Sequence, residues 1–397
     1  MKVARKKAEI RIAFHVMGGA HWVAGKIYLR NLLYALRQAY SKDVQLYLMA
    51  PAEENDVEDF TNFIQPDGVI SYGSPKTWRF FRKIDRLINR MLSRDIMVEK
   101  ALRAHGIDVF FGPWLVYKYR QVPTLSWLPD FQHIHLPEMF SGAERASRDG
   151  IFLQSARSAT RIVLLSETVR KDFESFAPDY AHKAIAIHPV SYIPEKIYDY
   201  DLKSILNLYN LPQKFIYLPN HFWKHKNHGL VFSALKILKD RGITATIVCT
   251  GYPGDRRNQT YFADLWQRAS QWGIRDQVIY IGIVPHENVL LLIRQSICVL
   301  NPSLFEGWGI TADEARSVGK HVLLSDIAPH QEQNIPRATF FDPRNCPDLA
   351  KKLEEIWCKS VPGPDKELEY EARLGLPKRI LDNAQCFMSV IQGVLNR

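Results

Sequence analysis

The sequence predicts an α/β fold made of two doubly wound, Rossmann-like domains, and three observations support this prediction. The chain has 397 residues, 46% of them apolar, which is enough for two sizeable cores. It opens with an apolar run over residues 11–17, the glycines Gly18 and Gly19, and a helical pattern over residues 24–40. A second alternation of short apolar runs and helical patterns begins at Phe215.

Short apolar runs of the kind found in buried parallel strands recur along the whole chain. In the first half they lie at residues 45–49, 69–72, 109–111, 124–127, 161–165 and 184–188, with a further helix at 147–159. In the second half strands are expected at 215–218, 246–250, 278–281, 297–300 and 321–324, and helices at 230–240, 261–271, 286–294, 311–318, 348–358 and 378–395. Residues 194–211 are rich in Pro, Tyr, Asp and Asn and suit a linker. The triplet Asp199-Tyr200-Asp201 within them follows no strand, so we interpret it as a coincidence and not as a metal site.

The formal net charge of +10 is compatible with three kinds of partner: nucleic acid, an anionic membrane or an anionic small substrate. No zinc-finger, RRM or KH pattern occurs, so nucleic acid is not expected. Lysine and arginine concentrate in residues 76–103, where aromatic and aliphatic residues recur at helical spacing. Such a helix can lie on an anionic leaflet, or it can face the core and leave its basic side solvated. Peripheral membrane contact through residues 76–103 therefore remains one of two open interpretations.

Cysteine usage and hydropathy point to a cytoplasmic protein, on the inner face of the membrane if the basic helix binds lipid. The five cysteines form no Cys-x-x-Cys pair, which suits a reducing compartment. No apolar run approaches the roughly 18 residues of a spanning helix. The basic N-terminus leads directly into the first strand, so we interpret it as strand and not as signal peptide.

The loop after the strand at 124–127 carries three titratable side chains, Asp130, His133 and His135. Open parallel sheets bind ligands at the carboxyl ends of their strands, so this loop is a candidate site. Polar residues on a solvated loop are the plainer alternative. A metal bound by the two histidines would need further ligands, and none occurs at a suitable spacing.

The stretch from 297 to 331 organises the second half of the chain. A strand at 297–300 is followed by Gly307-Trp308-Gly309 and by a helix that stops at Gly319. A helix that starts at glycines after a parallel strand offers N–H groups and a positive dipole end to an anion. Two carboxylates frame this start, Glu306 before it and Glu314 within the helix.

The Glu-x7-Glu pattern headed by Phe305-Glu306-Gly307-Trp308-Gly309 resembles the donor site of family 4 glycosyltransferases, which are retaining enzymes of the GT-B fold. The resemblance covers nearly the full chain and is strongest over 215–332. It implies two Rossmann-like domains that face a cleft, with residues 1–200 on the acceptor side and 201–375 on the donor side. It also implies a C-terminal helix, 376–397, that returns to the first domain.

The resemblance implies transfer of a sugar from a UDP- or GDP-sugar to a saccharide or lipid-linked saccharide acceptor, without metal or cofactor. The nucleotide sugar is then a co-substrate. Implied catalytic residues are Glu306, Asp130 and His133. Implied donor-binding residues are Gly18, Gly19, Asn220, Lys226, Val284, Glu306, Gly307, Trp308, Gly309, Ile310, Thr311 and Glu314. One carboxylate would hold the sugar and the other the ribose, with the diphosphate between them.

One departure concerns the donor phosphates. Lys226 matches the lysine of the family's Lys-Asn pair, but the family's arginine aligns with Asn220. Lys224 or His225 could supply the missing positive charge, and a solvated charge on a loop is the plainer alternative for Lys224.

Three other readings remain open. A nucleotide-sugar epimerase or a phosphorylase would share the GT-B fold. An NAD-dependent oxidoreductase would also have two α/β domains, but the chain lacks G-x-G-x-x-G. A two-lobed sugar-binding protein without enzymatic activity is the third.

Overall fold

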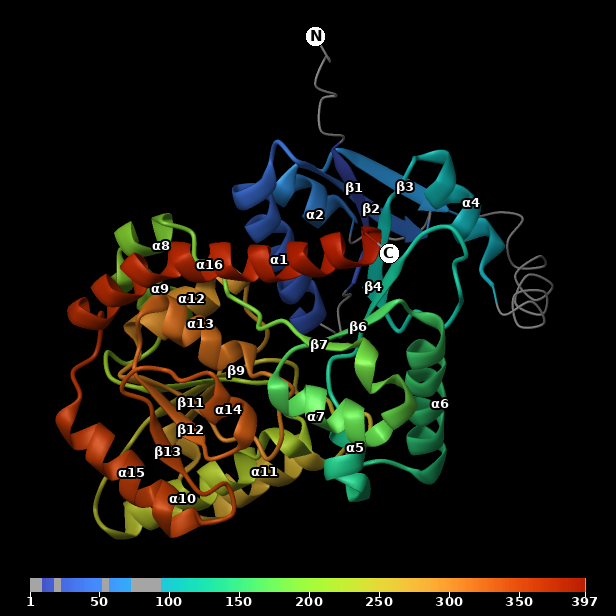
Figure 1. Cartoon of the computed structure of the whole chain (residues 1–397). Coiled ribbons are helices and arrows are strands. Elements are labelled where there is room, and N and C mark those ends of the chain that lie inside the picture. The colour runs from blue at the N-terminus through green and yellow to red at the C-terminus, as the bar shows by residue number, and fades with distance from the viewer. Residues whose placement is uncertain (1–8, 18–22, 52–56, 73–93, 397) are drawn as a thin grey trace. The chain divides into compact units, whose positions relative to one another are not determined.

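The computed structural model describes residues 9–17, 23–51, 57–72 and 94–396 (Figure 1). The chain forms two compact units. Unit 1 comprises Met1–Phe131, Gly142–Pro189 and Lys378–Arg397, and unit 2 comprises Gln132–Ser141 and Val190–Pro377. The 132–141 segment therefore belongs to a different unit from the residues on either side of it.

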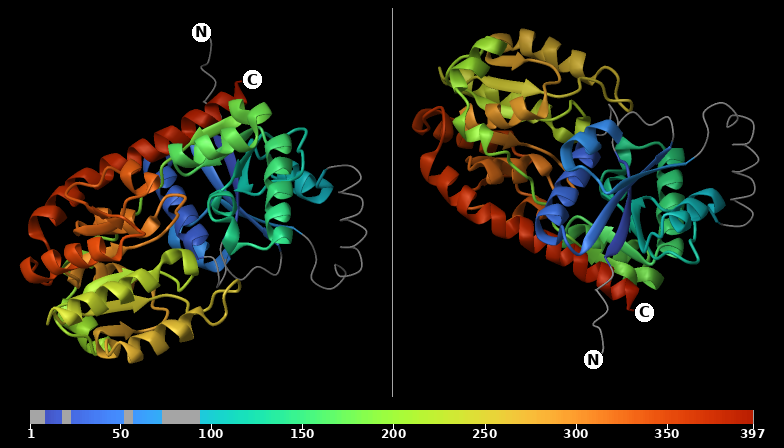
Figure 2. Two further views of the ribbon diagram at one scale, coloured as in Figure 1. Left: turned by 90° about the horizontal axis from the view of Figure 1, so that it is seen from below. Right: turned by 90° about the horizontal axis from the view of Figure 1, so that it is seen from above.

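Unit 1 is built on a parallel sheet with the strand order β3-β2-β1-β4-β5-β6-β7. The strands are β1 Ile10–His15, β2 Val44–Pro51, β3 Gly68–Tyr72, β4 Val109–Pro113, β5 Thr124–Trp127, β6 Arg161–Leu164 and β7 Ala184–Ala186. The flanking helices are α1 Val23–Tyr40, α2 Val57–Ile64, α4 Ile96–Ala104, α6 Gly142–Ser158, α7 Glu167–Phe176 and the 3-10 helix η2 Pro178–Lys183 (Figure 2). Phe14 on the central strand β1 is fully buried and its ring lies 5.7 Å from that of Phe111.

Unit 2 repeats this plan with a parallel sheet of order β10-β9-β8-β11-β12-β13. The strands are β8 Ile216–Pro219, β9 Ile247–Thr250, β10 Val278–Tyr280, β11 Cys298–Asn301, β12 Val322–Ser325 and β13 Thr339–Phe341. Its helices are α5 Gln132–His135, η1 Pro137–Met139, α8 Lys196–Asp199, α9 Leu202–Tyr209, η3 Lys224–Lys226, α10 His228–Asp240, α11 Tyr261–Gln271, η4 Arg275–Gln277, α12 His286–Gln295, α13 Ile310–Val318, α14 Ala328–Glu332, α15 Cys346–Lys359 and the first part of α16 Lys366–Leu395.

The two strand orders confirm the predicted doubly wound fold. In each sheet the order reverses beside the strand that comes first in the unit, between β1 and β4 and between β8 and β11. Open α/β sheets bind ligands outside the carboxyl ends of the strands at such a reversal. In unit 2 this point lies between the loops that follow Pro219 and Asn301.

The prediction of a linker at 194–211 is wrong, because most of this stretch is helical. Helices α8 and α9 bury Ile197 and Ile205, so the stretch contributes to the core of unit 2. Asp201 caps α9, and its side chain accepts a hydrogen bond from the amide of Lys203 at 3.1 Å. The aspartate triplet therefore has a local structural use.

The basic stretch 76–103 lies mostly outside the described residues, and only its end, in α4, is seen. There Ile96 and Met97 are 42% and 38% exposed. Among the helices that the structure describes, none has the length and apolar content to cross a bilayer.

Candidate active site

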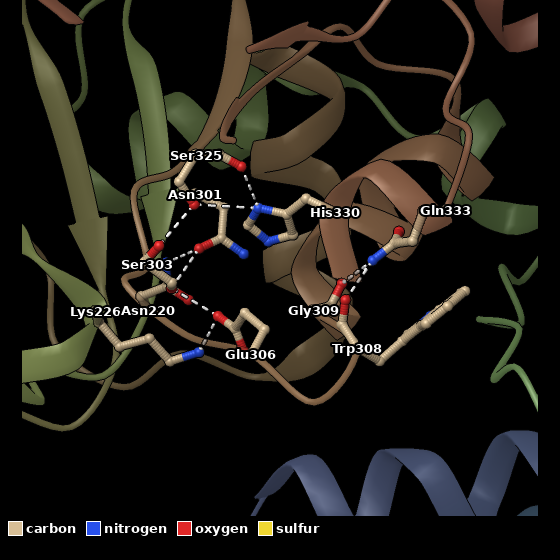
Figure 3. A network of polar contacts seen from close by, with 10 residues as sticks. All are labelled: Asn220, Lys226, Asn301, Ser303, Glu306, Trp308, Gly309, Ser325, His330 and Gln333. Atoms are coloured by element: carbon tan, nitrogen blue, oxygen red, sulfur yellow. Dashed lines mark hydrogen bonds and ion pairs between the residues drawn. The ribbon is translucent and has the colours of Figure 1, made fainter. Parts of the chain in front are cut away.

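The loops after β8 and β11 are joined by hydrogen bonds. Asn301, the last residue of β11, is fully buried, and its Oδ1 accepts a bond from Asn220 Nδ2 at 3.2 Å. Asn227 donates from Nδ2 to the carbonyl of Pro302 at 3.1 Å, and the amide of Leu304 donates to the carbonyl of His225 at 2.8 Å. These bonds hold the turn that carries Lys226 against the loop that carries Glu306. Figure 3 shows Asn220 and Asn301 together with Lys226 and Glu306.

Glu306 and Lys226 form an ion pair of 2.6 Å between Oε1 and Nζ, and their side chains are only 11% and 15% exposed. Ser303 Oγ lies 2.6 Å from the same carboxylate oxygen and donates to it. Burial by itself raises the pKa of Glu306, but the charge and hydrogen bond of Lys226, with His330 and Ser303, outweigh it and lower the pKa to about 2. Glu306 is therefore an anion at neutral pH.

Gly309 is the N-cap residue of helix α13, and its φ of +94° is a conformation that other residues rarely adopt. A Cβ at this position would lie 3.1 Å from the ring of His330 and 3.3 Å from the amide nitrogen of Gln333. Gln333 donates from Nε2 to the carbonyls of Trp308 at 2.6 Å and Gly309 at 3.2 Å. The backbone conformation therefore favours glycine, and a larger residue would also displace the side chains of His330 and Gln333 slightly.

His330 of α14 is fully buried, and Figure 3 shows it above Glu306. Its Nδ1 lies 2.9 Å from the carbonyl oxygen of Ser325. A carbonyl only accepts, so Nδ1 carries the proton and Nε2 is the acceptor in the neutral ring. Nε2 has no hydrogen-bond partner within the described part of the chain. Burial lowers the pKa of His330, although the charge of Glu306 opposes this effect.

Glu314 lies on the second turn of α13 and is 4% exposed. Its Oε1 is 2.5 Å from Nε2 of His286, which begins α12. The two carboxylates of the Glu-x7-Glu pattern thus have different cationic or donor partners, Lys226 for the first and a histidine for the second.

The loop after β5 is divided between the two units. Asp130 belongs to unit 1, where it accepts a hydrogen bond from Arg148 at 3.1 Å. His133 and His135 belong to unit 2, on α5. The His135 ring stacks on Phe305 with centroids 5.0 Å apart, directly beside Glu306 in the chain. His133 is 2% exposed, and its ring packs edge-on against Phe140.

Arg257, in the loop after β9, was not singled out by the sequence analysis. Its guanidinium carbon lies 4.6 Å from the ring centre of Phe140, and its Nη1 is 3.4 Å from Oε1 of Gln132. His225, which we expected as a possible source of positive charge, is 6% exposed, and burial followed by the charge of Lys226 puts its pKa well below the usual value. His225 is therefore neutral and cannot supply that charge. The two consecutive arginines in the loop after β9, Arg256 and Arg257, were the available signal.

The remaining predicted ligands are placed as follows. Gly18 and Gly19 lie outside the described residues. Val284 is half-buried in the loop after β10, and Trp308 is 4% exposed before α13. Among the described side chains, no group of three or more His, Cys, Asp or Glu residues could hold a metal ion. The ligand-binding roles of all these residues stay predictions.

Comparison with known proteins finds similarity to glycosyltransferases. Residues 204–373 match the family model of the Glycosyl transferases group 1. An O-antigen chain mannosyltransferase of Salmonella typhimurium, RfbU, is 24% identical over 175 residues. That alignment covers 41% of this chain and 47% of RfbU, so it spans about half of the relative.

Solved structures match almost the whole chain. Sucrose-phosphate synthase of Thermosynechococcus elongatus has a TM-score of 0.68 at 14% identity, with 98% of this chain and 100% of that chain covered. HepE of Anabaena, solved with UDP and glucose, has a TM-score of 0.66 at 13% identity, with 97% and 100% covered. A glycosyltransferase of Rickettsia africae ESF-5 has a TM-score of 0.64 at 13% identity, with 98% of both chains covered. At these identities the likeness concerns the fold. The chain thus has the GT-B fold, with a match to the group 1 glycosyltransferases over residues 204–373.

Proposed function

We propose that this protein is a retaining, metal-independent glycosyltransferase of family 4. It moves a sugar from a UDP- or GDP-sugar to a saccharide or lipid-linked saccharide acceptor. The observation that carries the proposal is the Lys226–Glu306 ion pair, placed where the sheet order of unit 2 reverses and directly before the start of α13. The similarity to the mannosyltransferase RfbU, to sucrose-phosphate synthase and to HepE, which was solved with UDP, supports a nucleotide-sugar donor.

The ion pair suits the chemistry of glycosyl transfer. The transition state has positive charge on the sugar ring and negative charge on the leaving diphosphate. Glu306, ionised because its pKa is about 2, accepts hydrogen bonds from sugar hydroxyls and stabilises the positive charge. Lys226 and the first amides of α13 stabilise the leaving group. With a pKa of about 2, Glu306 is too weak a base to take the proton of the acceptor hydroxyl, so the leaving phosphate takes that proton on the same face of the sugar.

Glu314 has the second role in this proposal. Its carboxylate accepts hydrogen bonds from the ribose hydroxyls of the nucleotide, in exchange for or in addition to the bond from His286. Asp130 and His133 are proposed to act near the transferred sugar, and unit 1 is proposed to recognise the acceptor. Half-buried Val284 is proposed to lie beside the base.

A thermal-shift panel tests the proposal. The full chain is heated with UDP, GDP or ADP and their common sugars, first without metal and then with Mg²⁺. A ligand that binds only the folded state raises the melting temperature. We expect one base family to stabilise the protein without metal, and Lys226→Ala and Glu314→Ala to remove the shift. Lys236→Ala, which changes an exposed lysine of α10, is the matched control.

Three results would argue against the proposal. No shift with any nucleotide, combined with a shift by NADH or by a free sugar, would favour an oxidoreductase or a sugar-binding protein. Turnover of the donor without any acceptor would favour an epimerase, and turnover with phosphate a phosphorylase. Retention itself is read from the anomeric configuration of the product by NMR.

Peripheral membrane contact is a separate part of the proposal. It rests on the basic stretch 76–103 and on the exposed Ile96 and Met97 at its end. We expect co-sedimentation with vesicles that contain phosphatidylserine, and weaker co-sedimentation after Ile96→Asp/Met97→Asp. Equal sedimentation with anionic and zwitterionic vesicles would exclude this contact.

A further inference from the structure

The charge balance at the Lys226–Glu306 pair indicates that a second cation is needed. The pair itself carries no net charge, and a nucleotide sugar brings the negative charge of a diphosphate. His225, next to Lys226, is neutral because it is buried. Lys224 lies on the same turn but is exposed to solvent, where a cation interacts weakly with a bound anion.

Arg257 is tied by its backbone to the turn that carries Lys226. The buried carboxylate of Asp255 accepts one hydrogen bond from the amide of Lys224 and another from the amide of Arg257, each 3.0 Å long. This carboxylate therefore connects the loop after β9 to the 3-10 helix Lys224–Lys226. The charges of Arg257, Lys226 and Glu306 all act on the ring of His225, which agrees with this proximity.

The guanidinium of Arg257 lies over the Phe140 ring and also has two acceptors at its edge. Its carbon is 4.6 Å from the centre of the Phe140 ring, a cation–π contact. Nε of Arg257 forms an ion pair of 3.4 Å with the carboxylate of Asp255, and Nη1 lies 3.4 Å from Oε1 of Gln132. That length exceeds the usual range for N–H···O bonds, so these bonds are weak. The side chain is 22% exposed, so the edge can be reached by a ligand.

We propose that Arg257 binds the diphosphate of the nucleotide sugar as the second cation beside Lys226. This inference rests on the function proposed above. An arginine can stack through its face and donate from its edge at the same time, and its planar fork matches two phosphate oxygens. The weak bonds to Asp255 and Gln132 are replaced by short, charge-assisted bonds to phosphate. Phe140, from the 132–141 segment, acts as a positioning residue that sets the plane of the fork.

The test compares Arg257→Gln with Arg256→Gln in the full chain. Arg256 is the adjacent residue, is exposed, and loses the same charge when it is replaced. The affinities of UDP, GDP and ADP, and of the matching nucleosides, are measured by calorimetry. For the diphosphate that binds the wild type, we expect Arg257→Gln to weaken binding about 10- to 100-fold. We expect its nucleoside to bind within about twofold of wild type, and Arg256→Gln to change neither affinity. Phe140→Leu is expected to give an intermediate loss.

The outcomes separate this inference from the proposed function. If no nucleotide binds the wild type, the proposed function fails and the role of Arg257 fails with it. If a diphosphate binds the wild type and Arg257→Gln equally well, only the role of Arg257 is refuted. An equal loss of diphosphate and nucleoside affinity would also refute it, since that result indicates damage to the fold.

Discussion

Replacing Lys226 with methionine should destabilise the protein at neutral pH because it leaves a buried carboxylate without its cation. The pKa of Glu306 falls from an ordinary 4.5 to about 2. At 1.36 kcal/mol for each unit, this difference corresponds to about 3 kcal/mol in favour of the ionised, folded state. Without Lys226 the burial effect dominates and the pKa rises. We expect Lys226→Met to lower the free energy of unfolding by about 2–4 kcal/mol at pH 7.

The pH dependence follows from the direction of the shift. A carboxylate whose folded pKa is depressed contributes stability above its unfolded pKa, and this contribution is lost as the pH falls through the folded pKa. For Glu306 this stability is lost as the pH falls from about 4.5 to about 2. In Lys226→Met the pKa of Glu306 is raised above 4.5, so the variant regains stability as the pH falls through that raised pKa. The stability difference between wild type and Lys226→Met should therefore be largest at neutral pH, start to shrink above pH 4.5, and shrink further between pH 4.5 and pH 2.

The assay is urea denaturation followed by tryptophan fluorescence, in a double-mutant cycle with Glu306→Gln. We expect a coupling energy of about 2–3 kcal/mol at pH 7 and a smaller one at pH 4. Lys236→Met, which removes an exposed i,i+4 pair with Asp240, is the control and should cost less than about 0.5 kcal/mol. Additive effects of Lys226→Met and Glu306→Gln, or a coupling energy that does not change with pH, would refute the reasoning.

Three further substitutions test other parts of unit 2. Glu314→Gln should weaken nucleoside binding about tenfold without loss of stability, as measured by calorimetry, and an unchanged affinity would remove the ribose role. Gly309→Ala forces an alanine into a φ of +94° and places its Cβ 3.1 Å from His330. It should lower the free energy of unfolding by about 1–3 kcal/mol and reduce nucleotide affinity. Wild-type stability and affinity would contradict this account. Gly319→Ala places a Cβ 2.5 Å from the backbone of Glu369 and should lower the melting temperature more than Gly309→Ala; the reverse order would show that this contact relaxes easily.

The parts of the site that were predicted are those encoded by neighbouring residues. Glu306, Gly309 and Glu314 lie within nine residues, and the strand, loop and helix around them follow from a short apolar run, two glycines and one helical pattern. Such a strand–loop–helix unit can be predicted from a short stretch of sequence. Glycine conformations, helix caps and the periodicity of apolar side chains are all set by residues a few positions apart. The same reasoning identified the alternation of strands and helices, and therefore the fold class.

The parts that were missed depend on residues far apart in the chain. Residues 194–211 appeared to be a linker because proline and aspartate interrupt the pattern, yet packing of Ile197 and Ile205 makes helices of them. The contact of Arg257 with the Phe140 ring could not be predicted from the sequence, because the two residues are more than a hundred positions apart.

The sequence by itself determined the type of each domain and the local order of the Glu-x7-Glu loop, because short-range backbone preferences are sufficient for both. Only the tertiary structure decided the partners and the ionisation of the site. Lys226 and Glu306 are 80 positions apart, and their contact lowers a carboxyl pKa that burial alone would raise. Likewise, the 132–141 segment joins unit 2 although its neighbours in the chain join unit 1. The physical reason is that charge interactions and desolvation depend on distance in space, which the chain order does not specify.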